Sequence, residues 1–309
     1  MQAQYTSQIL MVRPSSFQFN SETAASNLFQ KKLKNITETQ IQQIALNEFD
    51  TFVSTLRQHK IEVTVIEDTA KPIKPDAVFP NNWISSNSNG EIVLYPMCTA
   101  NRRLEVRSDI LDFLKEKFMV SAIIDLRDNI EKNRFLEGTG SIIFDHLHGI
   151  AYACISPRTN LTLFNKYCNQ IGYTPIAFNS VDMLGKAVYH TNVMLSVGDK
   201  FAVVCLESIT DATEKKWVIK NLEQTGHEII DISFTQMNAF VGNMLQVENV
   251  AGKTYLIMSE TAFKCLHHQQ IVQIKQYTEI ISVAIPTIET IGGGSARCMM
   301  AELFLDKKQ

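Results

Sequence analysis

Cysteine, histidine and glutamate together carry out nucleophilic attack on a carbonyl-like carbon, and this chain holds one of each at a polar or glycine-rich turn. They are Cys298, His190 and Glu137. Cys298 follows three consecutive glycines and stands beside Arg297 in the sequence, a setting that favours a thiolate. In such an arrangement the thiolate attacks and the imidazole moves protons, while the carboxylate either orients the imidazole or handles a proton on the substrate nitrogen.

Each of these residues also has a purely structural interpretation. Free cysteine is among the most buried residue types, so Cys298 also suits a core position after a tight turn. His190 suits a hydrogen-bonded histidine at a strand start, and Glu137 suits a solvated turn. The other histidines are expected on the surface (His59, His227, His267 and His268) or in a hairpin turn (His146 and His148).

A repeat in the chain must position these turns. Similar units start at residues 81, 137, 190, 242 and 294, in steps of 56, 53, 52 and 52 residues. Each unit reads as a polar turn, two strands, a helix and a third strand. The expected strands and helices are 83–85, 92–95, helix 101–117 and 119–125; 141–144, 150–155, helix 160–171 and 175–179; 192–197, 201–206, helix 211–224 and 228–232; 243–246, 254–258, helix 261–276 and 280–285.

The fifth unit starts at Gly294 and is expected to be completed by strand 8–12, helix 37–58 and strand 61–66. Five such units predict an α/β propeller, a closed ring of ββαβ-type modules around a central channel, in a single domain over residues 1–309. A ring closed by the N-terminal strand leaves no unpaired sheet edges. The turns then converge on one end of the channel, bringing together Asp76 to Asn82, Glu137, His190, Asn192, Asn243 and Cys298.

The composition limits the classes of partner. Of 309 residues, 45% are hydrophobic and 20% charged, and the net charge of -3 argues against nucleic-acid and membrane-surface binding. No apolar run reaches the roughly 18 residues of a membrane span, and no signal-peptide pattern begins the chain, so a cytoplasmic location is expected. The six cysteines lack CxxC or CxxH spacing, so we expect neither a disulfide framework nor a metal site.

Four segments resemble the signature turns of the pentein superfamily of guanidino-group-modifying enzymes, which includes arginine deiminases, dimethylarginine hydrolases and amidinotransferases. In chain order they are DAVFPNNW (76–83), EGTGS (137–141), HTN (190–192) and GGGSARCM (292–299). The resemblance implies the pentein propeller and a covalent intermediate on the cysteine. It also implies that Cys298 is the nucleophile, His190 the general acid/base and Glu137 the supporting carboxylate.

Two further segments resemble substrate-binding parts of the dimethylarginine hydrolases. Arg102 begins a paired-arginine segment whose first arginine binds substrate in that family, and Arg158 lies in a turn whose arginine grips the substrate carboxylate. An arginine presents a bidentate fork to a carboxylate, so both roles are chemically sound. The alternatives are a solvated helix face for Arg102 and a loop cation for Arg158.

Amides replace carboxylates at several positions of the family pattern. Asn81, Asn82 and Asn192 stand where relatives place acids that pair with a guanidinium. An amide offers both a donor and an acceptor, which suits a neutral ureido group. Asp76 remains as the acid of the first turn and is expected to bind the distal NH groups. The leading hypothesis is therefore hydrolysis of citrulline to ornithine, ammonia and carbon dioxide.

Three other functions stay open. The chain also fits an arginine deiminase or dimethylarginine hydrolase, and an amidinotransferase would use the same residues with a different acceptor. A ribosome-binding protein with the pentein ring is the non-catalytic alternative, and it predicts a missing nucleophile or histidine. For the enzymes we expect a small amino-acid substrate and no cofactor. The oligomeric state is open, with a homodimer among the options.

Overall fold

The computed structural model describes residues 2–308 and has a mixed α/β fold with five three-stranded sheets. Their strand orders are β15-β1-β2, β3-β4-β5, β6-β7-β8, β9-β10-β11 and β12-β13-β14. In every sheet the middle strand runs antiparallel to one neighbour and parallel to the other. Helices connect the parallel strands, as such crossovers require. The five predicted units are therefore confirmed.

The bounds of the elements follow the predicted repeat closely. The strands are β1 Gln8–Arg13, β2 Glu62–Glu67, β3 Ile84–Ser86, β4 Glu91–Leu94, β5 Ala122–Asp125, β6 Ile143–Asp145, β7 Ile150–Cys154, β8 Thr174–Phe178, β9 Leu195–Val197, β10 Phe201–Val204, β11 Glu228–Asp231, β12 Leu245–Glu248, β13 Thr254–Ser259, β14 Glu279–Val283 and β15 Ala301–Glu302. The helices are α1 Ser21–Ala24, α2 Glu38–Gln58, α3 Ala100–Arg103, α4 Ser108–Lys117, α5 Gly138–Ser141, α6 Leu161–Ile171, α7 Ala212–Gln224, α8 Phe234–Asn238, α9 Glu260–Cys265, α10 His268–Lys275 and α11 Pro286–Gly292.

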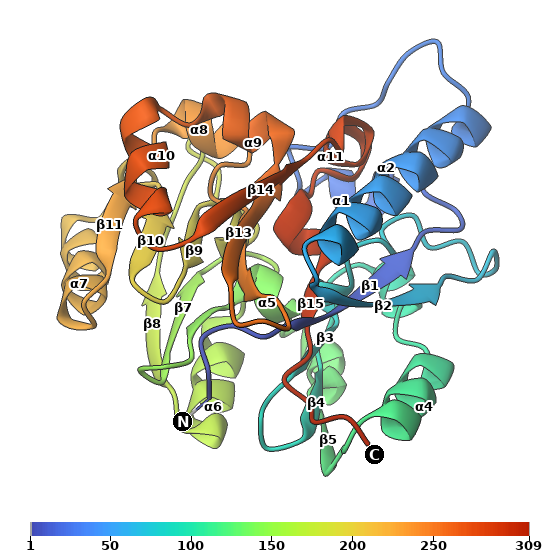
Figure 1. The fold of residues 1–309 in the computed structure, drawn as a ribbon, viewed down its shortest axis with the longest axis horizontal. Helices are drawn as coiled ribbons and strands as arrows, with labels where there is room; N and C mark the ends of the chain where they lie inside the picture. The colour runs from blue at the N-terminus through green and yellow to red at the C-terminus, as the bar shows by residue number, and fades with distance from the viewer. Residues whose placement is uncertain (1, 309) are drawn as a thin grey trace.

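The two ends of the chain share one sheet, as predicted. Leu10 of β1 pairs antiparallel with Ala301 of β15, and the same strand pairs in parallel with β2. First strands of different units also touch: β15 contacts β3, and β9 contacts both β6 and β12. In Figure 1 the strands lie toward the middle, while α2, α4, α6, α7 and α10 lie around the outside. A closed propeller around a channel stays a prediction.

Helix α2 shows how the sequence fixes one of these outer layers. Thr37 caps its start and forms a capping box with Gln40. The helix packs its apolar stripe against β1, β14 and α11. Burying a large apolar side chain contributes about 1.5–3 kcal/mol. The buried stripe is Ile41, Ala45, Phe49, Phe52, Val53 and Leu56.

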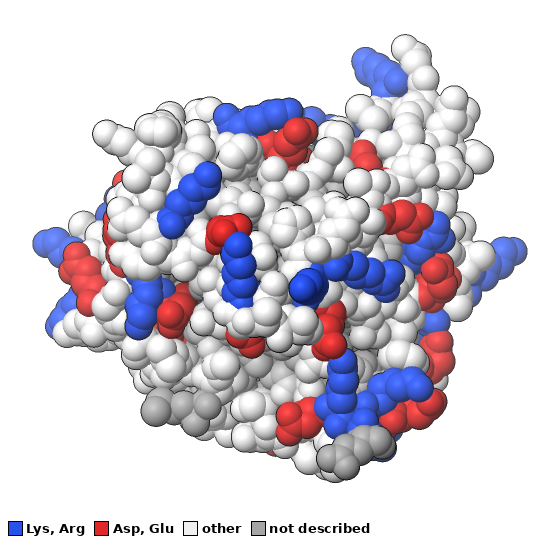
Figure 2. Space-filling model, viewed as in Figure 1, with Lys and Arg blue, Asp and Glu red and all other residues white. Residues whose placement is uncertain are grey.

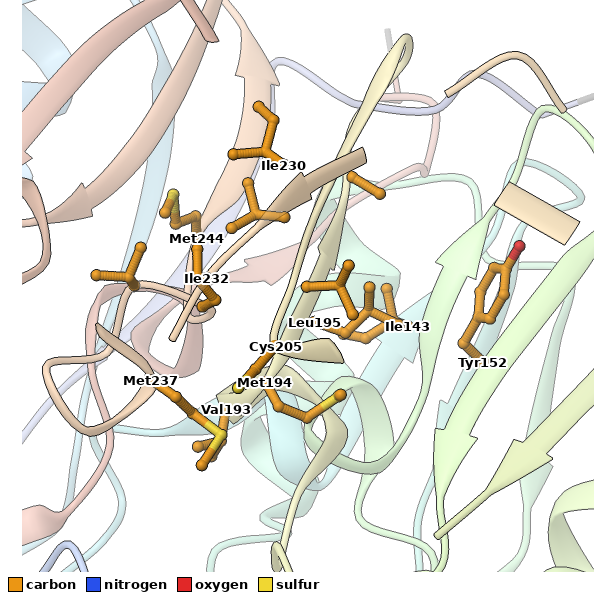
Figure 3. Packing of buried hydrophobic residues seen from close by; sticks show 14 of the residues in the cluster. Ile143, Tyr152, Val193, Met194, Leu195, Cys205, Ile230, Ile232, Met237 and Met244 are labelled. Atoms are coloured by element: carbon orange, nitrogen blue, oxygen red, sulfur yellow. The ribbon is translucent and has the colours of Figure 1, made fainter. Parts of the chain in front are cut away.

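A larger hydrophobic cluster fills the space around the sheet β9-β10-β11 (Figure 3). Val193 and Met194 enter it directly after the turn that carries His190, and Leu195 follows on β9. Met237 of α8 and Met244 contribute flexible side chains that fill irregular gaps. The packing of Val193 and Met194 therefore anchors one of the candidate catalytic turns to the core.

The structure corrects several predicted boundaries. The expected helix 101–117 is divided into α3 and α4, because Arg107 is extended and Arg102 and Glu105 turn inward to form a buried ion pair. The expected helix 261–276 is divided into α9 and α10, because His267 is extended and caps the second helix. The sequence analysis also did not predict α1, α5, α8 or α11.

Charged side chains intermix over the face of the molecule that Figure 2 shows, with basic and acidic groups side by side. This distribution accords with the small net charge of -3. No helix within residues 2–308 is long and apolar enough to cross a membrane.

Candidate active site

Four short turns bring the predicted residues together. They are the one-turn helices Pro80–Asn82, Thr191–Val193 and Ala296–Met299, together with α5, which Figure 1 places near the middle of the molecule. Helix α5 contacts the first two turns, and the first also contacts the last. Gly138 opens α5 at a φ of 48°, and a Cβ there would collide with the Asn81 carbonyl oxygen. The close approach of these turns therefore requires glycine.

The turns enclose a small pocket. Its empty volume is about 250 Å³, including the space at its opening. Six of the nine predicted site residues line it. The lining residues are Asn27, Asp76, Phe79, Asn82, Arg102, Arg158, Tyr189, His190, Gly292, Gly293, Gly294 and Cys298.

Amide donors surround the Cys298 sulfur. The Nδ2 atoms of Asn192 and Asn243 each lie 3.3 Å from its Sγ and donate to it. Asn243 is held in this orientation because its Oδ1 accepts from the backbone N–H of Arg297 at 3.0 Å. The two N–H donors face the atom on which charge develops as the sulfur attacks, and Asn243 Oδ1 also lies 3.7 Å from it. The Arg297 side chain does not take the expected role, because it binds the Met300 carbonyl oxygen and Glu302.

His190 and Glu137 form a buried pair behind the pocket. His190 Nε2 lies 2.8 Å from Glu137 Oε2, and Oε1 of the same carboxylate accepts from the Cys98 backbone N–H at 2.8 Å. Burial opposes ionisation of Glu137, but Arg158 and His190 outweigh it and lower its pKa to about 2. Burial lowers the pKa of His190 to about 4, although Glu137 opposes this shift. At neutral pH the ionised carboxylate therefore accepts a proton-bearing Nε2, which leaves Nδ1 of a neutral imidazole as the base.

Arg102 fixes the orientation of the Asn82 amide. Its guanidinium grips Glu105 with two bonds of 2.8 Å and donates from Nη1 to Asn82 Oδ1 at 2.7 Å. The amide cannot be turned over, because its NH2 group would then face a guanidinium, which has no acceptor. Asn82 Nδ2 is buried and finds no hydrogen-bond partner among residues 2–308. The pocket thus has a donor whose direction is set by Arg102.

Acceptors without partners complete the site. Asp76 Oδ2 accepts from Asn20 Nδ2 at 2.7 Å and from Thr23 Oγ1 at 3.2 Å. Its Oδ1 is buried and unpartnered within the described residues, as is Oδ1 of Asn192. Burial raises the pKa of Asp76, whereas Arg102 acts against that shift. Asp76 therefore adds an unsatisfied acceptor to the pocket lining, and Asn192 holds a second one beside Cys298, one contact from the lining.

Arg158 connects the pocket to the segment that follows β1. Its Nη2 donates to Ser26 Oγ at 2.7 Å and to the Thr23 carbonyl oxygen at 3.1 Å. Its Nη1 lies 3.5 Å from Glu137 Oε2, and its guanidinium stacks over the Tyr189 ring at 5.1 Å. Arg158 is thus positioned at the pocket by two neutral acceptors and, at longer distance, by the Glu137 carboxylate.

Eight of the nine predicted site residues lie at the pocket or one contact from it, and Asn81 does not. Its Nδ2 donates to Thr139 Oγ1 at 3.3 Å, away from the pocket lining. The sequence analysis did not find Asn20, Thr23 or Tyr189. Asn20 caps α1 and would have been recognisable as a helix N-cap, but nothing in the sequence indicated that this turn contacts Asp76.

The chain was compared with known proteins. The family model of eukaryotic N,N dimethylarginine dimethylhydrolases matches residues 13–305. The search of curated proteins finds no significant match. Among solved structures, the substrate-bound N-terminal domain of ArgZ, an arginine dihydrolase of the ornithine–ammonia cycle in cyanobacteria, is 15% identical with a TM-score of 0.73. That match covers 96% of this chain and 97% of that domain.

The citrulline complex of DDAH from Pseudomonas aeruginosa is 14% identical with a TM-score of 0.68, over 97% of this chain and 100% of that one. Against the longer ArgZ chain in its apo structure, the match covers 95% of this chain but only 40% of ArgZ. Identities this low show a shared fold alone. The family model spans nearly the whole chain, and the chain therefore belongs to the N,N dimethylarginine dimethylhydrolase family, within the pentein superfamily that its signature turns indicated.

Proposed function

We propose that this protein hydrolyses the ureido group of citrulline through a covalent intermediate on Cys298. The observation that carries this proposal is the amide of Asn82, a residue of the pocket lining: Arg102 binds its Oδ1, which leaves Nδ2 as a buried donor without a partner among residues 2–308. A ureido carbonyl oxygen accepts a hydrogen bond from that donor. Every nitrogen of a guanidinium carries hydrogen and can only donate, so a guanidinium would place a second donor against the Asn82 Nδ2 group. A buried polar group left unpaired costs about 1–3 kcal/mol, so the site discriminates against a guanidinium.

The remaining polar atoms suit the NH groups of the same ureido group. Oδ1 of Asp76 and Oδ1 of Asn192 are unpartnered acceptors within residues 2–308. They can receive the ureido N–H donors while Asn82 binds the carbonyl oxygen. Arg158, a buried cation of the pocket lining, is proposed to bind the substrate carboxylate, and the predicted role of Arg102 in substrate binding stays a prediction.

In the proposed reaction Cys298 acts as the nucleophile and His190 transfers the protons. His190 Nδ1 takes the thiol proton of Cys298 as its Sγ attacks the ureido carbon, and it then delivers that proton to the departing NH2 group, which leaves as ammonia. The thiocarbamate that remains is hydrolysed when His190 Nδ1 takes a proton from water, and Cys298 is released. The product is a carbamic acid, which loses carbon dioxide to give ornithine. Citrulline and one water thus give ornithine, ammonia and carbon dioxide.

The second candidate is hydrolysis of a guanidino group, as in the family's dimethylarginine hydrolases. Asp76 favours it, because a buried carboxylate oxygen without a partner suits a cationic head group. An amidinotransferase would use the same residues. For each candidate we propose one catalytic domain over residues 1–309 built as a pentein propeller, in accord with the five repeated sheets.

A substrate panel with purified protein tests the proposal. Citrulline labelled with 13C at the ureido carbon, arginine and methylated arginines are each incubated, and ammonia, amino-acid products and labelled carbon dioxide are measured. We expect equal amounts of ornithine, ammonia and labelled carbon dioxide from citrulline. Production of citrulline from arginine or a methylarginine, with citrulline itself left intact, would reject the ureido substrate in favour of the guanidino candidate.

A further inference from the structure

A second cluster of reactive side chains lies where the sheets of β6 and β9 meet, at the strand ends away from the catalytic turns. Asp145 ends β6, His148 lies in the turn before β7, and His227 immediately precedes β11. Their ligand atoms all lie within 4.8 Å of one another, and no other group of three such residues is found in residues 2–308. The expectation of a surface-exposed His227 is wrong, because its ring is buried against the Gly198 carbonyl oxygen.

Asp145 is a buried carboxylate without a permanent cation. It is fully buried, and within residues 2–308 it forms no ion pair with lysine or arginine. The cationic candidates that face it are His148 Nδ1 at 2.8 Å and His227 Nδ1 at 3.9 Å. A buried charge without compensation is costly, so this position favours a bound cation or a protonated histidine.

Hydrogen bonding selects the metal-binding tautomer of His227. Its Nε2 lies 3.1 Å from the Gly198 carbonyl oxygen, and a carbonyl only accepts, so Nε2 carries the proton. Nδ1 then presents a lone pair on the side of Asp145. Thr225 Oγ1 lies 2.8 Å from that nitrogen but also 2.9 Å from the Asn221 carbonyl oxygen. With Nε2 protonated, the Thr225 hydroxyl donates to Nδ1, so a metal ion must displace it, and its proton then turns to the Asn221 carbonyl oxygen.

We propose that Asp145, His148 and His227 bind one divalent transition-metal ion of the zinc class. Two imidazoles with one carboxylate suit Zn²⁺, Co²⁺ or Ni²⁺, whereas Mg²⁺ and Ca²⁺ prefer oxygen ligands alone. Tetrahedral ligands around zinc lie about 3.3 Å apart. The His227–Asp145 distance is 3.9 Å and all three ligand atoms lie within 4.8 Å of one another, so side-chain movements must close these separations. The His148 side chain is 32% exposed and offers the ion a path from solvent.

Metal binding would join two sheets through their loops. The ion would replace the Nδ1 proton of His148, which is released to solvent, and would link the β6–β7 turn to the connection between α7 and β11. An ion that binds only the folded chain raises its melting temperature by mass action. The inference concerns a site separate from the proposed reaction and does not depend on it.

The test uses the Cys298→Ser protein, so that the thiolate cannot bind the metal. Co²⁺ is titrated at pH 7.5 while its visible ligand-field absorption is recorded, followed by competition with Zn²⁺ and Mg²⁺. We expect one Co²⁺ per chain, displaced by Zn²⁺ but not by Mg²⁺, and a Zn²⁺-dependent rise in melting temperature. In the same background, His148→Gln and His227→Gln should each weaken binding at least tenfold.

His146→Gln is the matched control, because His146 lies in the same turn but bonds to Tyr173 and is outside the cluster. His227 is buried, so its variant is interpreted only beside the partly exposed His148→Gln. The proposal is overturned if the protein shows no saturable Co²⁺ or Zn²⁺ binding at 100-fold molar excess. It is also overturned if His148→Gln binds as the control does, since the hydrogen bond between His148 and Asp145 then explains the cluster without metal.

Discussion

Replacing Asn82 by aspartate tests whether the amide selects the head group. Arg102 Nη1 donates to Asn82 Oδ1 at 2.7 Å, and a carboxylate in the same place keeps this bond and strengthens it. The substitution therefore removes the Nδ2 donor while leaving the surrounding ion pairs intact. For citrulline, an unpaired ureido oxygen costs about 1–3 kcal/mol, which lowers kcat/KM about 5- to 150-fold.

The same change should improve a guanidino substrate. A charge-assisted hydrogen bond contributes about 1.5–3 kcal/mol, which raises kcat/KM for arginine about 10- to 150-fold. The two effects together shift the ratio of citrulline to arginine kcat/KM by about 10² to 10⁴. The measurement is steady-state ammonia release with both substrates, with ornithine and citrulline separated by chromatography.

Asn81→Asp is the matched control, because it introduces the same buried charge one residue away and outside the pocket lining. Its substrate ratio should stay within about threefold of the unmodified protein. Melting temperatures of both variants establish that they are folded. A folded Asn82→Asp protein whose ratio of citrulline to arginine kcat/KM also stays within threefold would refute the argument that the oriented amide selects the head group of the substrate.

Three further predictions concern the catalytic group. Cys298→Ser should abolish turnover, and mass spectrometry should find no covalent adduct; measurable turnover by that variant would exclude the covalent mechanism. Glu137→Gln should lower kcat by about 10²-fold or more and shift the acid limb of kcat/KM to lower pH, because the carboxylate raises the His190 pKa; a purely structural role would leave the limb in place. The pKa of His190 is about 4 in the folded protein and near 6.5 in the unfolded chain. The contribution of His190 to the free energy of unfolding, measured with urea, is therefore fully present above pH 6.5 and falls by up to about 3 kcal/mol as the pH is lowered to 4. His190→Gln should flatten that decline.

The sequence predicted the repeat well, because local patterns of apolar residues define the strands and helices of each unit. Alternating strands and the helical stripe of 37–58 appear directly in apolar spacing, and a regular period of 52–56 residues relates the units. The division of helix 101–117 was not visible. Its break depends on Arg102 turning inward to Glu105, a tertiary ion pair that overrides helical propensity.

The repeat predicts that the turns carrying Cys298, His190 and Glu137 meet, as they do in the structure, and the catalytic roles of these residues stay predictions. Contacts that the repeat does not determine were missed. Asn20 contacts Asp76 across 56 positions, and His227 reaches Asp145 from the neighbouring sheet. No CxxH spacing or local motif indicates such a cluster, because its side chains come from different loops. Spatial proximity alone reveals it.

The two buried arginines, Arg102 and Arg158, differ in how readily they can bind a substrate carboxylate. Arg102 already holds the Glu105 carboxylate with two bonds of 2.8 Å, and breaking these would leave a buried charge unpaired. Arg158 has only a longer contact of 3.5 Å with the Glu137 carboxylate, and its short bonds go to Ser26 Oγ and the Thr23 carbonyl oxygen, neutral acceptors that a substrate carboxylate replaces with a stronger bond. We infer that Arg158 binds the substrate carboxylate while Arg102 acts as a positioning residue. The arginine that resembles a substrate ligand would then set specificity through the amide it orients.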